Sequence, residues 1–233
     1  KDTWVGGLAA KLTRVKFIRT RHLSSPINSS KLNFINELAD YIFTTGESVR
    51  SEMIKNNRIN PIKIMSVPTG IDPDIYNPSK YNKNACRKLF NLKDDCFVIG
   101  IIAVLRNFKR HDRFLRMARN IIDINPEKKL YFVIAGDGPQ KKNLTDMINI
   151  LGLQNNVLML GHISNVPALL TALDIFVLTS DNAEGVPQSV IQALFMQTAV
   201  VSTNAGSSKD LYHEKNFILV DKDSQNELNE ACN

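Results

Sequence analysis

Apolar strand-length runs alternate with amphipathic helix-length stretches along most of this chain, and this alternation constrains its fold more than any other feature. Strands are predicted at residues 96–105, 130–135, 157–160, 174–178 and 199–202. Helices are predicted between them, at 83–91, 110–124, 140–151, 166–173 and from about residue 188. Strands separated by helices form parallel sheets with crossover connections. Because the strand runs are apolar almost throughout, we expect a doubly wound sheet covered on both faces.

A shorter stretch of the same alternation comes first. Helices are predicted at 2–13, 31–40 and 47–56, and strands at 16–19, 41–45 and 62–67. Residues 68–78, PTGIDPDIYNP, contain Pro, Gly, Asp and Asn, which disfavour both helix and central strand. We therefore expect one domain at 1–70, with an incomplete sheet, and a second, nearly complete one at 71–233. The chain begins without Met and stops where a polar helical pattern starts, so we expect that both ends are cut from a longer protein.

Composition and charge narrow the class of protein. The 233 residues are 43% hydrophobic, which is typical of a globular chain, and no apolar run approaches the ~20 residues of a spanning helix. Three widely spaced cysteines indicate a reducing, cytoplasmic compartment. Residues 1–70 hold eleven Lys and Arg against five Asp and Glu, whereas the remainder is balanced. The first segment could face a phosphorylated substrate or the inner face of a membrane, and a solvated basic surface is the alternative. No nucleic-acid partner is expected.

Polar or glycine-containing loops follow the strands of the second half. They are RNFK at 106–109, GDGP at 136–139, GHIS at 161–164 and the stretch TSDNAEGVPQS from residue 179. The loops that follow parallel strands emerge at one edge of the sheet, where ligands bind. The last of them opens a helix near Pro187, and a helix start offers N–H groups and a positive dipole end to an anion. The pattern therefore predicts a phosphate-bearing ligand at this edge.

Together these segments resemble glycosyltransferase family 4. The order is PTGID, VLRNFKRHDRFL, VIAGDGPQKKNL, GHISNVPALLTALDIFVLTSDNAEGVPQSVIQAL and AVVSTNAGSSKDL, and the resemblance covers nearly all of residues 62–220. It implies a GT-B-like α/β fold of two Rossmann-like domains. It also implies a glycosyltransferase that moves a sugar, with retention, from a nucleotide-diphosphate donor of the UDP or GDP type to an acceptor hydroxyl. The expected acceptor is a glycan or a lipid-linked saccharide.

The resemblance assigns catalytic roles to four residues. Arg106 and Lys109 match the family's cations, which stabilise charge that grows on the departing phosphate, although a helix start with solvated bases is the alternative. Glu184 matches the residue that contacts donor-sugar hydroxyls, and otherwise would be a surface acid beside a helix start. His22, in RTRHLS, matches a histidine that faces the sugar from the first domain, and otherwise is a loop histidine.

Further residues are expected to bind the donor. The family's second Glu, which holds the ribose, is replaced by Gln192, whose amide still makes hydrogen bonds but lacks the charge that strengthens them. Ile163 matches a position that reads the base through backbone groups. The turn residues Gly185, Val186, Pro187, Gln188 and Ser189 complete the expected site, Pro187 offering no N–H. We expect no bound metal and no cofactor besides the donor substrate, since no set of ligands has metal-site spacing.

Two alternative functions remain open on the sequence. The chain could be a non-catalytic, glycosyltransferase-like binding domain, which Gln192 and the short first domain would suit. It could instead be another Rossmann-type nucleotide enzyme such as a dehydrogenase, but the Gly-x-Gly-x-x-Gly fingerprint after a first strand is missing.

Overall fold

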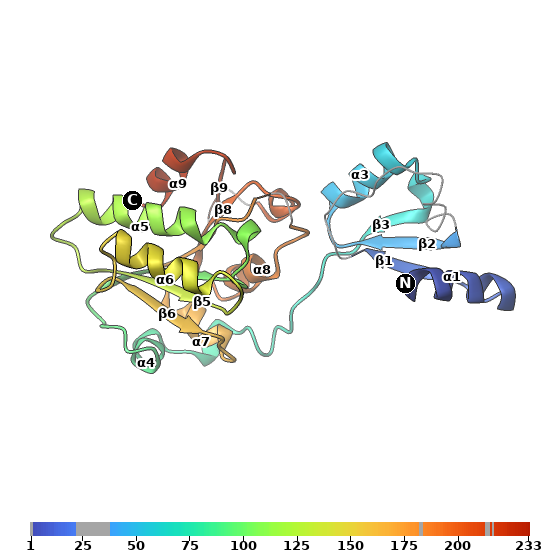
Figure 1. Ribbon diagram of the computed structural model, residues 1–233. Helices are drawn as coiled ribbons and strands as arrows, with labels where there is room; N and C mark the ends of the chain where they lie inside the picture. Colours follow the sequence, from blue (N-terminus) through green and yellow to red (C-terminus); the bar gives the residue numbers. More distant parts are fainter. Residues whose placement is uncertain (1, 22–37, 182–183, 213–214, 216) are drawn as a thin grey trace.

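The computed structural model describes residues 2–21, 38–181, 184–212, 215 and 217–233. Its strands form two sheets, one in each half of the chain (Figure 1). The smaller sheet has the order β1-β2-β3 and the larger the order β6-β5-β4-β7-β8-β9, and the described pairings are parallel. The α/β class and the two parallel sheets predicted from the sequence are confirmed.

The smaller sheet belongs to the first unit, residues 2–66. Its elements are α1 (Asp2–Thr13), β1 (Ile18–Arg21), β2 (Tyr41–Thr44), α3 (Glu47–Asn57), the short 3-10 helix η2 (Pro61–Lys63) and β3 (Ile64–Ser66). The buried side chains Ile42 and Ile64 of the sheet pack with Val49 and Met53 of α3. This small core fixes the first turn of α3 relative to the end of β2.

The larger sheet belongs to the second unit, residues 78–233. Its elements are η3 (Pro78–Lys80), α4 (Lys83–Leu89), β4 (Phe97–Ile102), η4 (Asn107–Lys109), α5 (His111–Ile124), β5 (Leu130–Ala135), α6 (Lys141–Ile150), β6 (Val157–Gly161), α7 (Val166–Ala172), β7 (Ile175–Leu178), α8 (Gln188–Phe195), β8 (Ala199–Thr203), η5 (Ser208–Leu211), β9 (Phe217–Val220) and α9 (Gln225–Ala231).

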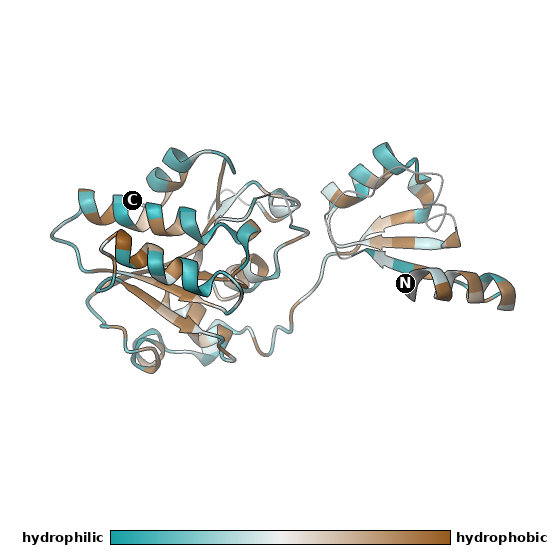
Figure 2. Cartoon of the chain, viewed as in Figure 1, coloured by the Kyte–Doolittle hydropathy of each residue, from teal (hydrophilic) through white to brown (hydrophobic). Residues whose placement is uncertain are grey.

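Helices cover both faces of the larger sheet, and each face has its own core. Helices α5, α6 and α9 pack on one face, whereas α4, α7 and α8 pack on the other (Figure 1). Successive residues of β4 alternate between them, since Ile99 and Ile101 enter the first core and Val98 enters the second. Apolar residues accordingly concentrate in the strands and on the inner faces of the helices (Figure 2).

Tight turns hold the carboxyl edge of this sheet together. Ala103 N donates to Ala135 O at 3.0 Å, and Leu105 N donates to Asp137 O at 3.0 Å. Gly136 has a φ of +140°, and a Cβ at this position would lie 2.0 Å from Ala103 O, so only glycine fits. These contacts fix the direction in which the chain leaves β4.

Most predicted elements occur within a few residues of their predicted bounds, but some differ. The strand predicted at 96–105 ends at Ile102 because residues 103–105 turn to bond the neighbouring loop. The strand predicted at 16–19 lies at 18–21, and that predicted at 62–67 is shortened by η2. Strand β9 was not predicted, and helix α9 forms where the sequence showed the start of a polar helical pattern. The helix predicted at 31–40 lies mostly outside the described residues, and the domain boundary at residue 70 stays a prediction.

Candidate functional site

The loops that follow β4, β5, β6 and β7 meet at the carboxyl edge of the larger sheet, as predicted for parallel strands. One hollow at this edge, here called the α8 hollow, has a volume of about 390 Å³. It is lined by Ile102, Ala103, Val104, Ala135, Gly136, Asp137, His162, Ile163, Val166, Gln188, Ser189 and Gln192. The structure thus brings together four residues predicted to bind the donor, from two segments of the chain: Ile163, Gln188, Ser189 and Gln192.

Lys109 and Glu184 form an ion pair in which Lys109 Nζ donates to Glu184 Oε1. The two side chains are only 13% and 9% exposed. Lys109 Nζ also lies 5.4 Å from the centroid of the Phe108 ring. The buried Thr179, just after β7, donates its hydroxyl to the carbonyl oxygens of Lys109 and Arg110 at 2.8 and 2.9 Å. Two residues predicted to act on the same ligand therefore meet, although they are 75 positions apart.

The backbone of Glu184 is held by the turn that follows β8. A Cβ on Gly206 would lie 1.8 Å from Glu184 O, and Gly206 has a φ of +57°. Only glycine allows this approach without strain. Ser207 N donates to Gly185 O at 3.3 Å. Gly206 and Ser207 therefore position the loop that carries Glu184, although the sequence pattern did not single them out.

Helix α8 begins at Gln188 and has no side-chain cap, because the preceding residue, Pro187, has an extended backbone and no capping group. The amides of Gln188 and Ser189 lie in the first turn of α8, where the helix dipole is positive, and both residues line the α8 hollow. By contrast, Val186 N donates to Thr45 O of the first unit at 3.2 Å. The Val186 amide is thus engaged and not available to a ligand in this arrangement.

A second hollow of about 290 Å³ lies at the α5 and α6 side of the same edge. It is lined by Arg106, Asn107, Arg110, His111, Asp112, Gln140, Leu144 and Asp181. Arg106 is exposed there and makes no ion pair with a described residue. Arg110 pairs with Asp112 at 3.0 Å. The structure therefore does not place Arg106 in the α8 hollow with Ile163, Gln188, Ser189 and Gln192, and Lys109 and Glu184 are likewise not among the residues that line it.

His111, at the start of α5, is buried beside the Lys109 turn. Its side chain is 2% exposed, and neither ring nitrogen has a hydrogen-bond partner among the described residues. Burial, reinforced by the positive charge of Lys109, lowers the pKa of His111 from 6.5 to about 4. His111 is therefore neutral at pH 7.

Two further predictions concern His22 and bound metal. His22 lies outside the described residues, so its predicted role stays a prediction. Within the described ranges, no cluster of three or more His, Cys, Asp or Glu could hold a metal ion. The helices of those ranges are also too short or too polar to cross a membrane.

Comparison with curated proteins identifies relatives that are named as glycosyltransferases. The UDP-Gal:alpha-D-GlcNAc-diphosphoundecaprenol alpha-1,3-galactosyltransferase of Escherichia coli is 32% identical over 145 residues, which are 60% of this chain and 36% of the relative. The glycosyltransferase MJ1059 of Methanocaldococcus jannaschii, itself uncharacterised, is 29% identical over 191 residues, 78% of this chain and 46% of the relative. This chain thus spans less than half the length of either relative.

Comparison with solved structures gives the fold. The crystal structure of Anabaena Alr3699/HepE in complex with UDP superposes with a TM-score of 0.86 at 21% identity, covering 98% of this chain and 65% of that one. This similarity confirms the GT-B-like arrangement of two parallel-sheet units. The family model of glycosyl transferases group 1 matches residues 96–233, which hold the whole edge described above. The chain therefore belongs to the glycosyl transferases group 1 family.

Proposed function

We propose that this chain is part of an enzyme that transfers a sugar from a nucleotide-diphosphate donor to an acceptor hydroxyl. One observation carries the proposal: the Lys109–Glu184 pair and the uncapped start of α8 lie at the same sheet edge as the α8 hollow. Family membership supports it, as do a relative named for UDP-Gal and a structural neighbour that binds UDP. The donor is of the UDP or GDP type.

The second unit holds the donor in this proposal. The base and ribose occupy the α8 hollow, against Ile163 and Gln192, and the diphosphate lies between Lys109 and the first turn of α8. Charge that grows on the departing phosphate is stabilised by Lys109 and by the amides of Gln188 and Ser189. Because Lys109 is largely buried, its charge acts in a medium that screens it less than water does.

Glu184 positions the sugar in this proposal. Its carboxylate now accepts a hydrogen bond from Lys109 and, with donor bound, would also accept from sugar hydroxyls, with Gly185 alongside. Arg106 is not assigned a contact with the diphosphate in this proposal. It lines the neighbouring hollow, and its side chain would have to change direction across the sheet edge to reach the diphosphate. Transfer with retention, by same-face displacement through an oxocarbenium-like transition state, is the route that the family resemblance implies.

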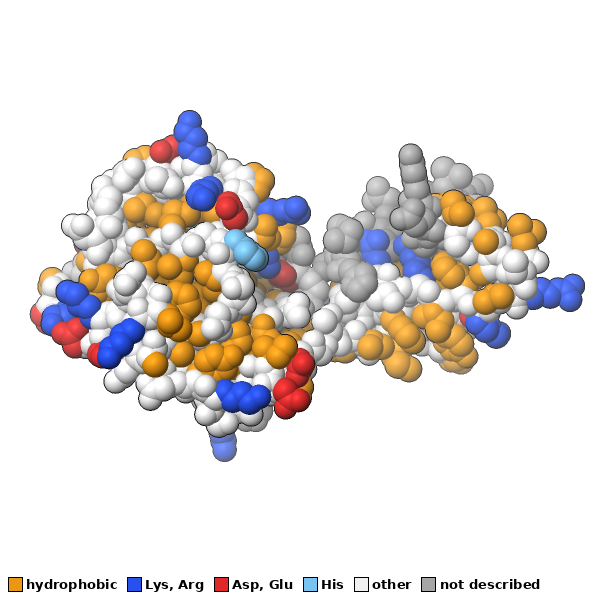
Figure 3. All heavy atoms as spheres, turned by 90° about the horizontal axis from the view of Figure 1, so that it is seen from below, with side chains coloured by type: hydrophobic (Ala, Val, Ile, Leu, Met, Phe, Trp, Pro, Cys, Tyr) orange, Lys and Arg blue, Asp and Glu red, His pale blue; other side chains and the backbone are white. Residues whose placement is uncertain are grey.

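The acceptor is assigned to the first unit, which carries the excess positive charge. A glycan or lipid-linked saccharide is the proposed acceptor class, with His22 facing the donor sugar. Exposed apolar side chains accompany the basic ones on this unit (Figure 3), and they include Val5, Leu12, Ile18, Tyr41 and Met65. Basic and apolar groups on one surface suit peripheral contact with an anionic membrane.

A transfer assay tests the proposed function. The complete protein would be given UDP-, GDP- and ADP-sugars with a lipid-linked acceptor, and Lys109→Ala would be compared with Lys142→Ala, which removes an exposed lysine of α6. We expect loss of transfer in the first variant and normal transfer in the second. Unchanged turnover in Lys109→Ala would remove the central assignment. Binding of UDP without transfer of any sugar would favour the non-catalytic alternative, and tighter binding of NAD than of UDP would favour the dehydrogenase alternative.

A further inference from the structure

The start of α3 in the first unit contacts the second unit close to Glu184. Val186 N donates to Thr45 O at 3.2 Å, and Glu47 N donates to Asp210 Oδ2 at 2.8 Å. Ser48 N donates to Ser207 Oγ at 3.3 Å, and the two serine hydroxyls also hydrogen-bond each other. The partners of these bonds lie about 140 to 163 positions apart, so the contact joins the two units.

Gly46 makes this approach possible. A Cβ on Gly46 would lie 2.1 Å from Ser207 Oγ and 3.2 Å from Val186 Cγ2. Its backbone is extended, with a φ of −177°, so the glycine is required by space and not by conformation. Any larger residue would push the two units apart at this point.

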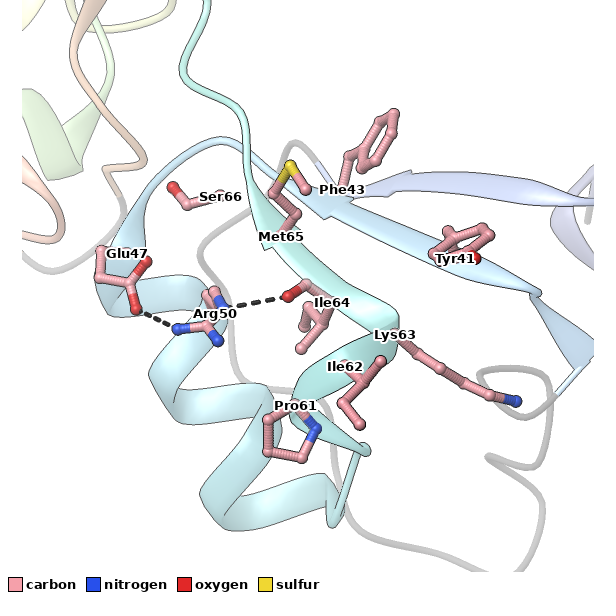
Figure 4. A pocket seen from close by; sticks show the side chains of 10 residues that line it. All are labelled: Tyr41, Phe43, Glu47, Arg50, Pro61, Ile62, Lys63, Ile64, Met65 and Ser66. Atoms are coloured by element: carbon pink, nitrogen blue, oxygen red, sulfur yellow. Dashed lines mark hydrogen bonds and ion pairs between the residues drawn. The ribbon is translucent and has the colours of Figure 1, made fainter.

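The first turn of α3 is itself bonded to the smaller sheet through Arg50. Arg50 pairs with Glu47 at 2.6 Å and donates Nε to Ile64 O of β3 at 3.0 Å (Figure 4). These bonds lie beside a hollow lined by residues of β2, α3, η2 and β3. A movement of the first unit is therefore transmitted to the contacts that Glu47 and Ser48 make.

On the other side, the contact leads directly to Glu184. Val186, which bonds Thr45, is two residues after Glu184 in the same loop. Ser207, which bonds Ser48, also donates its N–H to Gly185 O and follows Gly206, whose backbone touches Glu184 O. The loop that carries Glu184 is therefore held between α3 and the turn after β8.

We propose that this contact is a positioning clamp, in which Gly46, Ser48, Ser207 and Asp210 hold Glu184 in place when the two units are together. When the units separate, the loop at 184–186 loses its bond to Thr45, and Glu184 is no longer held from the first unit. The clamp thus couples approach of the acceptor-side unit to the geometry of the donor-side carboxylate. Its kinetic consequence rests on the proposed function, whereas its structural consequence does not.

Hydrogen exchange tests the clamp without reference to any reaction. The amides of Val186, Glu47 and Ser48 donate across the contact, so their exchange reports its opening. Gly46→Ala should raise exchange at these amides about tenfold or more, whereas amides of β5, in the middle of the second unit, should be unaffected. The matched control is Gly70→Ala, because a Cβ at Gly70 meets nothing within 4 Å. Equal exchange in the two variants would overturn the proposal.

Kinetics then separate positioning from simple structural support. Asp210→Ala removes the acceptor of the Glu47 amide, whereas Asp210→Asn keeps a side-chain oxygen that can still accept. In the complete protein, Asp210→Ala should lower kcat about tenfold while the donor KM changes less than about threefold, and Asp210→Asn should restore most of the loss. Asp146→Ala, an exposed acid on α6, is the control and should change neither constant.

The outcomes distinguish the two proposals. Raised hydrogen exchange across the contact in Gly46→Ala, with no sugar transfer by the wild-type protein, would support the clamp and contradict the proposed function. Normal transfer with unaltered exchange would do the reverse. Altered exchange together with an unchanged kcat in Asp210→Ala would show a contact between the units that does not position Glu184, and would overturn the proposed role.

Discussion

The Lys109–Glu184 pair gives the prediction that separates a binding site from a structural ion pair. Both side chains are largely buried, so removing one partner leaves the other charge mostly desolvated and without its counter-ion. Such single removals typically cost 3–5 kcal/mol, and we expect a loss of about 3 kcal/mol in the free energy of unfolding for either Lys109→Met or Glu184→Gln. The double variant should lose much less than the sum, with a coupling of about 2 kcal/mol.

UDP then gives opposite results in the two single variants. In Glu184→Gln, Lys109 has lost its partner and a diphosphate replaces it, so UDP should stabilise this variant more than the wild type. In Lys109→Met the cation is gone, and UDP should stabilise less than in the wild type. A ligand at a hundredfold excess over its Kd stabilises by ~2.7 kcal/mol, which is readily measured.

Urea unfolding with and without UDP, followed by circular dichroism, measures both effects. The control is Asp123→Asn, which breaks the more exposed Arg119–Asp123 pair of α5 and should cost less than about 1 kcal/mol with no effect of UDP. Additive losses in Lys109→Met and Glu184→Gln, with equal stabilisation by UDP, would refute the assignment of this pair to the donor site.

Three further predictions concern the buried His111, Gln192 in the α8 hollow and the tightly packed Gly136. The pKa of His111 is about 4 in the fold and 6.5 when unfolded, so the neutral imidazole's contribution to the free energy of unfolding is present above pH 6.5 and is lost as the pH falls through 4. We expect the wild type to lose about 3 kcal/mol over this range and His111→Leu to escape that loss, as measured by urea unfolding at each pH. Gln192→Glu should tighten UDP binding roughly fivefold in calorimetric titration, because a carboxylate accepts stronger hydrogen bonds from the ribose, and Gln192→Ala should weaken it. Gly136→Ala should destabilise the second unit by about 3 kcal/mol, since φ is +140° and Ala103 O lies 2.0 Å from the new Cβ; a change below about 1 kcal/mol in thermal unfolding would contradict this reason.

The large sheet could be predicted from the sequence because its strands are buried on both faces. A strand such as Leu130–Ala135 is apolar along its length, and the helices on either side carry their own periodic pattern. The same patterns do not mark short, partly exposed elements. Strand β9, whose Ile218 is half exposed, follows a turn-rich stretch and was missed.

The sequence predicts which loops meet at the carboxyl edge of the larger sheet, but it does not predict the direction of a side chain that tertiary contacts determine. Lys109 and Glu184, which follow the neighbouring parallel strands β4 and β7, meet at this edge of the sheet. Arg106 points to the neighbouring hollow, and this depends on how residues 103–105 bond the 136–140 loop, which no local pattern encodes. The contact of α3 with Ser207 and Asp210 joins segments about 160 positions apart, so no single stretch of sequence announces it.

A crystal structure of the complete protein with UDP would test the donor site most directly. We predict a diphosphate oxygen within hydrogen-bonding distance of Lys109 Nζ, the ribose beside Gln192 and the base against Ile163 in the α8 hollow. UDP bound instead in the hollow beside Arg106 and His111, with the Lys109–Glu184 pair untouched, would contradict the assignment.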